Sequence, residues 1–137
     1  MPKEFARQLL AHEKASRDPA DGSHFVAFAV CEKLRTPLGK FMGSRGYSSL
    51  LARAQVLGCA DIPWLCQLQI NPDGSFGGLE ELARKLDPGV AAEGEVVLVG
   101  HLLALLVTFI GPALTLQLLH DVWPEWAIRV IAEEEPL

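Results

Sequence analysis

Apolar positions recur at three- and four-residue steps through most of the chain, a spacing typical of amphipathic helices. In the first such stretch, residues 2–17, Phe5, Leu9 and His12 fall on one face and charged side chains occupy the others. We therefore expect a first helix with one buried side. It should end at residues 18–22, because proline cannot continue a helix and glycine relaxes the turn.

A second apolar face extends over residues 25–41, and Ser23 is suited to cap that helix. Pro37 interrupts it, and a threonine–proline pair is also a good helix start, so the segment is either one kinked helix or two short ones. After a glycine-rich break at residues 43–46, an apolar stripe over residues 47–57 predicts a third helix that ends before residue 61.

The middle of the chain is the one place where a strand is expected. Polar and apolar residues alternate over residues 65–70, and the Asn-Pro-Asp-Gly sequence at 71–74 is a strong turn signal. A short hairpin that pairs residues 65–70 with 75–77 and an irregular loop both remain open. Leucines at three- and four-residue steps then predict a short helix over residues 79–86.

Residues 96–119 carry no charged side chain apart from a histidine, and they are long enough to cross a bilayer. However, Gly111-Pro112 would bend a span near its middle, and neither flank carries the Lys or Arg that anchors one. A helix apolar on all sides also suits the centre of a helical domain. We therefore expect a central helix over residues 96–110, with a second piece over 112–122. The side chains expected in its core are Val99, Leu102, Leu103, Leu106 and Phe109.

Together these segments predict an all-α domain, or a mainly α domain with one short β-hairpin, built as an orthogonal helical bundle around the central apolar helix. The 137 residues match the usual size of one domain. We expect residues 1–132 to form that domain, and residues 133–137, which are rich in glutamate, to form a disordered acidic tail.

The net charge and the cysteine content disfavour some classes of function and some compartments. A net charge of −5 argues against nucleic-acid binding, and against docking on anionic lipid by charge alone. Cys31, Cys59 and Cys66 are odd in number and form no C-x-x-C pair, so we expect three small buried hydrophobic side chains rather than a disulfide framework. With no apolar signal core in the first thirty residues, these features favour a cytoplasmic location.

The segment over residues 43–49 has the residue types of an anion site, because glycines, hydroxyls and an arginine precede free amides at a helix start. It lacks the G-K-[ST] ending of a phosphate loop, so a plain helix connection capped by Ser44 or Ser48 is the alternative. A histidine within the apolar segment either lines a pocket or is a hydrogen-bonded core residue. The candidate ligand-binding residues are Ser44, Arg45, Tyr47, Ser48 and His101.

Trp123 and Trp126 flank a proline near the end of the chain. Tryptophan is over-represented at interfaces, so these residues are candidates for a subunit or partner contact. The alternative is a lid that folds back against Phe5 and the first helix. If the tryptophans form a subunit contact, we expect a homodimer centred on residues 122–131 that buries at least ~1,000 Å² of surface in total.

Several strings in the chain resemble a group of small bacterial helical proteins of unknown function. They are CEKLR-x-PL over residues 31–38, G-x-x-GY-x-x-LL-x-RA over 43–54, VVLV over 96–99, LLVTFIG-x-ALTL over 105–116 and DVWP over 121–124. The chain departs from that group at Pro112, where an acidic residue often follows the glycine. The resemblance implies a bacterial, cytosolic helical protein, and it supplies no activity and no site residues.

With no nucleophile, paired carboxylates, metal set or dinucleotide fingerprint in the sequence, we expect no cofactor, and the pattern does not favour an enzyme. The leading hypothesis is a non-enzymatic interaction or regulatory module that self-associates or binds a protein partner. The alternatives are a helical bundle that binds a small molecule or a lipid, and a membrane-active helical protein.

Overall fold

The computed structural model describes residues 2–16 and 26–124. The expected fold class is confirmed, since these residues are mainly helical with one short antiparallel hairpin. The acidic tail at 133–137 lies outside the described residues. In chain order the elements are α1 (Pro2–Ser16), α2 (Val26–Met42), α3 (Ser44–Cys59), the 3₁₀ helix η1 (Pro63–Gln67), β1 (Gln69–Ile70), β2 (Phe76–Gly77), α4 (Leu79–Lys85) and α5 (Pro88–Val122).

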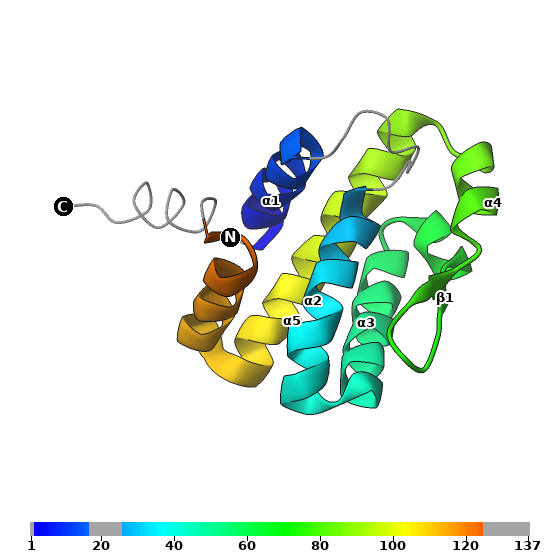
Figure 1. Cartoon of the computed structure of the whole chain (residues 1–137). Coiled ribbons are helices and arrows are strands. Elements are labelled where there is room, and N and C mark those ends of the chain that lie inside the picture. Colours follow the sequence, from blue (N-terminus) through cyan, green and yellow to red (C-terminus); the bar gives the residue numbers. More distant parts are fainter. Residues whose placement is uncertain (1, 17–25, 125–137) are drawn as a thin grey trace.

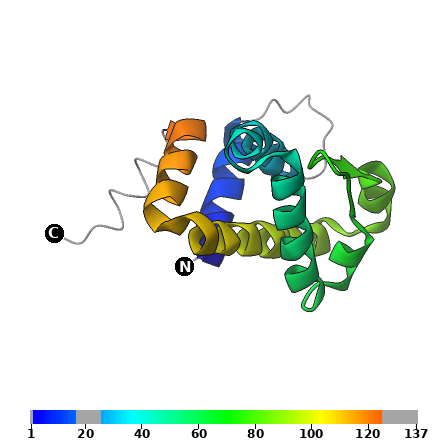
Figure 2. The same cartoon turned by 90° about the horizontal axis from the view of Figure 1, so that it is seen from below.

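Helix α5 extends through the length of the molecule, and α1, α2 and α3 all pack against it (Figures 1 and 2). Leu98, Leu102 and Leu106 are fully buried, and a fully buried leucine contributes about 1.5–3 kcal/mol to the free energy of unfolding. The prediction of a central buried helix is therefore confirmed for four of its five named residues: Val99, Leu102, Leu103 and Leu106.

The prediction is wrong for Phe109, whose side chain is 69% exposed. Phe109 lies three residues after the buried Leu106, so helical spacing alone places it on the covered side. However, α2 ends at Met42 and α3 begins at Ser44, and this junction lies at the same end of the molecule as the last turn before the bend in α5 (Figure 1). Among the described residues, the end of α2 and the start of α3 leave a groove beside Phe109 and do not cover its side chain.

The bend expected at Gly111-Pro112 is present. Gly111 has φ 85° and ψ 160°, a conformation that side chains with a Cβ rarely adopt. Pro112 then starts the second helical piece, and Thr115 Oγ1 donates a 2.8 Å hydrogen bond to the Gly111 carbonyl. Because the chain turns back here, residues 112–122 return towards α1 (Figure 1).

Helix α2 is continuous through Pro37, which settles the choice between one helix and two short ones. Ser23, the expected cap, lies outside the described residues. Instead, the Ala27 amide donates a 2.9 Å hydrogen bond to the buried Glu95 carboxylate of α5. A carboxylate at a helix N-terminus satisfies a free amide and suits the helix dipole. An acid far away in sequence therefore fixes the start of α2.

The hairpin is shorter than the longest version expected. Gln69 pairs with Gly77 and Ile70 with Phe76, whereas residues 65–67, expected as strand, belong to η1. Pro63 at the start of η1 explains the difference, since its fixed φ suits a first helical turn. Helix α4 confirms the short helix expected over 79–86.

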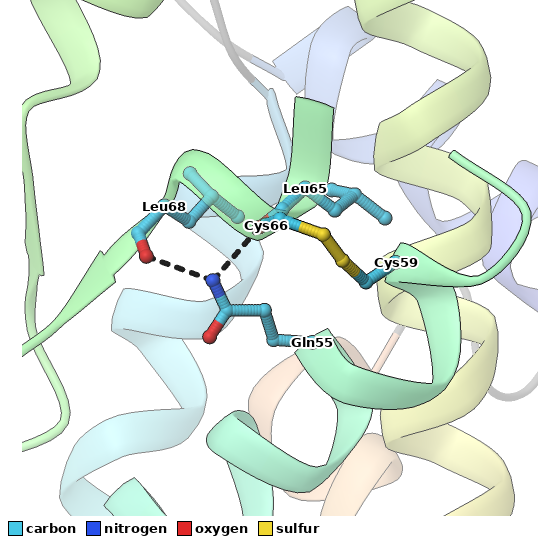
Figure 3. Close-up of a disulfide and its surroundings, with 5 residues drawn as sticks. All are labelled: Gln55, Cys59, Leu65, Cys66 and Leu68. Atoms are coloured by element: carbon cyan, nitrogen blue, oxygen red, sulfur yellow. Dashed lines mark hydrogen bonds between the residues drawn. A yellow bond between two sulfur atoms is a disulfide. The ribbon is translucent and has the colours of Figure 1, made fainter. Parts of the chain in front are cut away.

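Cys59, at the end of α3, and Cys66, in η1, form a disulfide with a Cα–Cα distance of 5.3 Å (Figure 3). Beside them the Gln55 side-chain amide donates 2.8 Å hydrogen bonds to the Leu65 and Leu68 carbonyls. The expectation of three buried, unpaired cysteines is therefore wrong for two of them, and it holds for Cys31. Disulfides are typical of oxidising compartments, so the cysteine argument for a cytoplasmic location no longer stands.

Candidate functional site

The structure places the residues of the segment predicted to bind an anion in different surroundings. Gly43, with φ 81°, occupies the N-cap position of α3 with no side-chain cap hydrogen bond, so neither Ser44 nor Ser48 caps the helix. Ser44 and Arg45 are exposed in its first turn, and Ser48 Oγ donates a 2.8 Å hydrogen bond to the Asn71 carbonyl. The side chains of Ser44 and Arg45 therefore face solvent, whereas that of Ser48 connects α3 to the hairpin turn.

Tyr47, one of the predicted ligand-binding residues, is a core residue. Its side chain is 0% exposed, and its hydroxyl donates a 2.7 Å hydrogen bond to the Cys31 carbonyl of α2. Its ring also lies against the hairpin turn, because a Cβ added at Gly74 would lie 2.7 Å from Tyr47 Cδ2. Tyr47 therefore joins α2, α3 and the hairpin.

Burial also raises the pKa values of the Cys31 thiol and the Tyr47 hydroxyl. Burial of Cys31 raises the pKa of its thiol to about 12, an effect that the Tyr47 hydroxyl partly offsets. Burial raises the pKa of Tyr47 as well. Both groups stay neutral at ordinary pH, so Cys31 carries no thiolate character and is unsuited to act as a nucleophile.

His101 lies far from the other predicted ligand-binding residues. It is half-buried on α5, where a Cβ added at Gly58 would lie 3.7 Å from His101 Cδ2. Gly58 lies 14 residues after Ser44 on α3, a separation of roughly 21 Å along a helix. The structure therefore does not bring His101 together with Ser44 and Arg45.

Trp123 is also buried within the chain rather than exposed for an interface. Its indole Nε1 donates a 2.9 Å hydrogen bond to Glu13 Oε2 of α1, and Lys33 Nζ of α2 lies 2.8 Å from Glu13 Oε1. For Trp123 the structure matches the fold-back alternative, in which the indole packs against the first helix. Trp126, and with it most of the expected dimer centre at 122–131, lies outside the described residues.

A cavity between α2, α3 and α5 was not anticipated from the sequence. A groove of about 780 Å³ opens between the end of α2, the first half of α3 and the part of α5 before its bend. Phe41 and Phe109 line it and remain exposed, at 62% and 69%. We call this cavity the bend-end groove. Its other lining residues are mainly apolar and are Met42, Gly46, Ser49, Leu50, Arg53, Leu105, Thr108 and Ile110.

The surroundings of the bend-end groove are cationic, although the whole chain is acidic. No Asp or Glu occurs over residues 33–60 or 96–120, so the negative charge lies elsewhere. Lys40 and Arg45 are exposed on either side of the α2–α3 junction, and Arg53 lines the groove. Among the described residues, none of these three cations forms an ion pair.

Helix α5 is long and apolar enough to cross a membrane by length and composition, and about 39% of its most apolar stretch is buried. Most of its buried residues lie before the bend, Thr115 and Leu119 are buried after it, and Val107, Leu114 and Leu116 around the bend are exposed. α5 is thus a core helix whose bend at Gly111 is surrounded by exposed apolar side chains.

Within residues 2–16 and 26–124, no group of three His, Cys, Asp or Glu side chains is placed to hold a metal ion. Comparisons with protein-family models, with curated proteins and with solved structures found no match. Membership of the bacterial group that the sequence resembles therefore stays a prediction.

Proposed function

We propose that the chain is a non-enzymatic binding module and that the bend-end groove is its binding surface. The observation that carries this proposal is the pair Phe41 and Phe109, two phenylalanines from different helices that both line one groove while most of their surface stays exposed. Soluble domains rarely expose large apolar side chains together unless something binds there.

The size and lining of the groove support the same proposal. A volume of about 780 Å³ lies within the usual range of ligand pockets, which are mostly apolar with a few polar groups that orient the ligand. Arg53, Ser49 and Thr108 are those polar groups, although Thr108 Oγ1 already donates a 3.0 Å hydrogen bond to the Ala104 carbonyl. Arg53 is the group best suited to make binding selective for an anionic partner, because its guanidinium is always positively charged.

The second candidate function, a bundle that binds a small molecule or a lipid, uses the same groove. It is favoured by the concave shape and by the single arginine, which together suit a molecule with an apolar body and an anionic head. The expected homodimer has less support, because Trp123, one of its two aromatic anchors, is buried within the chain.

The anionic apolar dye anilinonaphthalene sulfonate tests the groove as a binding surface. We expect the folded protein to bind the dye saturably. Phe109→Ser should weaken this binding at least about tenfold, because burying a phenylalanine side chain against a ligand contributes more than a factor of ten in affinity. The matched control is Val90→Ser, since Val90 is also exposed on α5 but lies near its other end. Equal dye binding by wild type and both variants would refute the proposal.

A further inference from the structure

We propose that the bend end docks on the surface of an anionic phospholipid bilayer, an inference that rests on the proposed function and names its partner. The bend end consists of the α2–α3 junction and the bend in α5, which lie at the same end of the molecule (Figure 1). There Phe41 and Phe109 enter the boundary between headgroups and acyl chains, and Lys40 and Arg45 contact lipid phosphates.

The distribution of exposed apolar side chains favours a bilayer over a single partner helix. A helix seated in the bend-end groove would cover Phe41 and Phe109. It would not cover Val107 and Leu114, which are exposed on either side of Gly111 and do not line the groove. A lipid surface is not limited to the outline of the groove, so it also suits exposed apolar side chains beyond it, as it does for amphipathic elements that lie in the interface.

The charges favour an anionic surface and disfavour a second copy of the chain. Lys40, Arg45 and Arg53 surround the exposed phenylalanines, with no acidic residue over positions 33–60. Each Lys or Arg close to an anionic bilayer increases the affinity about fivefold. A symmetric dimer through the same end would instead bring these like charges together across the two-fold axis.

The fold explains why the docking is interfacial and does not require α5 to cross the bilayer. Helices α1, α2 and α3 pack against α5, and Leu102 and Leu106, which lie before the bend, are fully buried. The acidic residues lie outside the cationic segment, so they oppose deeper approach of the whole domain to an anionic surface. The bilayer contact is thereby confined to the bend end.

The test measures co-sedimentation of the full chain with vesicles of phosphatidylcholine alone and of phosphatidylcholine mixed equally with phosphatidylglycerol. We expect binding to the mixed vesicles, at least about tenfold weaker binding to phosphatidylcholine, and a loss of binding as salt is raised. Lys40→Gln with Arg45→Gln should weaken binding to the mixed vesicles about thirtyfold. Phe41→Ser with Phe109→Ser should weaken it at least about a hundredfold, because both insertions are lost.

Two matched controls keep surface charge and apolar loss equal elsewhere on the molecule. Arg84→Gln with Lys85→Gln removes two exposed cations of α4, and Val90→Ser removes an exposed apolar side chain near the start of α5. Both should bind mixed vesicles like wild type. All substituted residues are exposed, so unchanged thermal unfolding should show that every variant is folded.

A tryptophan at the bend reports where the chain meets the lipid. The chain already has three tryptophans, so their emission in wild type is subtracted. The added emission of Phe109→Trp should then shift to the blue on mixed vesicles and be quenched by brominated lipid, whereas that of Val90→Trp should show neither change. If wild type binds the dye but no vesicle, the lipid proposal fails and the binding module stands. If the controls weaken vesicle binding as much as the bend-end variants, or if those variants abolish a dimer instead, the lipid proposal also fails. If neither dye nor vesicle binds, both proposals fail.

Discussion

The indole Nε1 of Trp123 donates a 2.9 Å hydrogen bond to Glu13 Oε2, and 110 residues separate the two in sequence. Both side chains are buried, and Lys33 reaches the same carboxylate from α2. One carboxylate thus connects α1, α2 and the end of α5, and it holds the returning segment of α5 in place.

Glu13→Ala should lower the free energy of unfolding by about 1–3 kcal/mol, because the buried indole N–H loses its acceptor. Urea unfolding measures the change. Glu4→Ala, on the same helix but in an exposed pair with Arg7, is the control and should stay within about 0.5 kcal/mol of wild type. A double-mutant cycle with Trp123→Phe should give a coupling energy of at least about 0.5 kcal/mol, and additive effects would show that the hydrogen bond contributes nothing.

Leu106→Ala should cost about 2–5 kcal/mol, the usual result of truncating a fully buried leucine. Phe109→Ala, three residues later, should change the free energy of unfolding by less than about 0.5 kcal/mol, because its side chain is 69% exposed. Chemical denaturation of both variants checks the contrast. Similar losses at the two positions would mean that Phe109 is covered in solution.

Gly94→Ala should lower the free energy of unfolding and Gly89→Ala should not, although both glycines lie on α5. A Cβ at Gly94 would overlap the indole ring of Trp64, whereas a Cβ at Gly89 would meet no atom within 4 Å. We expect Gly94→Ala to lower stability by about 1–3 kcal/mol through overpacking. Gly89→Ala should leave stability unchanged or raise it by up to about 1 kcal/mol. Thermal unfolding distinguishes the two, and a stable Gly94→Ala would contradict the close packing of Trp64.

Replacing Cys59 and Cys66 together by serine should lower the free energy of unfolding by about 2–3 kcal/mol, because the unfolded chain regains the freedom of an eight-residue loop. A reductant should destabilise wild type by a similar amount and leave the double variant unchanged. Thiol titration in denaturant gives an independent check, since only Cys31 should react without reductant. Three reactive thiols under those conditions would show that the disulfide is absent.

Stability should fall as the pH rises from about 9 towards 12. The pKa of Cys31 is raised to about 12 in the folded chain, so the unfolded chain releases this proton first and gains from alkaline pH. The raised pKa of Tyr47 acts in the same direction at higher pH. Cys31→Ala should make the free energy of unfolding fall less steeply with pH, by up to about 1.4 kcal/mol per pH unit. The variant is made in the background without Cys59 and Cys66 to prevent thiol–disulfide exchange. Parallel pH profiles with and without Cys31 would contradict this account.

The sequence by itself determined where the helices lie and where the long apolar helix bends. Helical periodicity and the proline and glycine positions are local signals, and they located α1, α3, α4 and the bend at Gly111. The same signals placed Tyr47 on an apolar stripe, where the structure finds it buried. None of the predicted ligand-binding residues, which are Ser44, Arg45, Tyr47, Ser48 and His101, lines the bend-end groove.

Only the tertiary structure decided which apolar residues are covered and which charges gather. Spacing gives the face of a helix on which Leu106 and Phe109 lie, but not which of the two side chains the neighbouring helices cover. The net charge of −5 likewise does not reveal the cationic end at Lys40 and Arg45, because a sum over all residues does not say where the charges lie in space. The Cys59–Cys66 disulfide and the Glu13–Trp123 hydrogen bond depend on how separate elements meet in space, which periodicity along one chain does not encode.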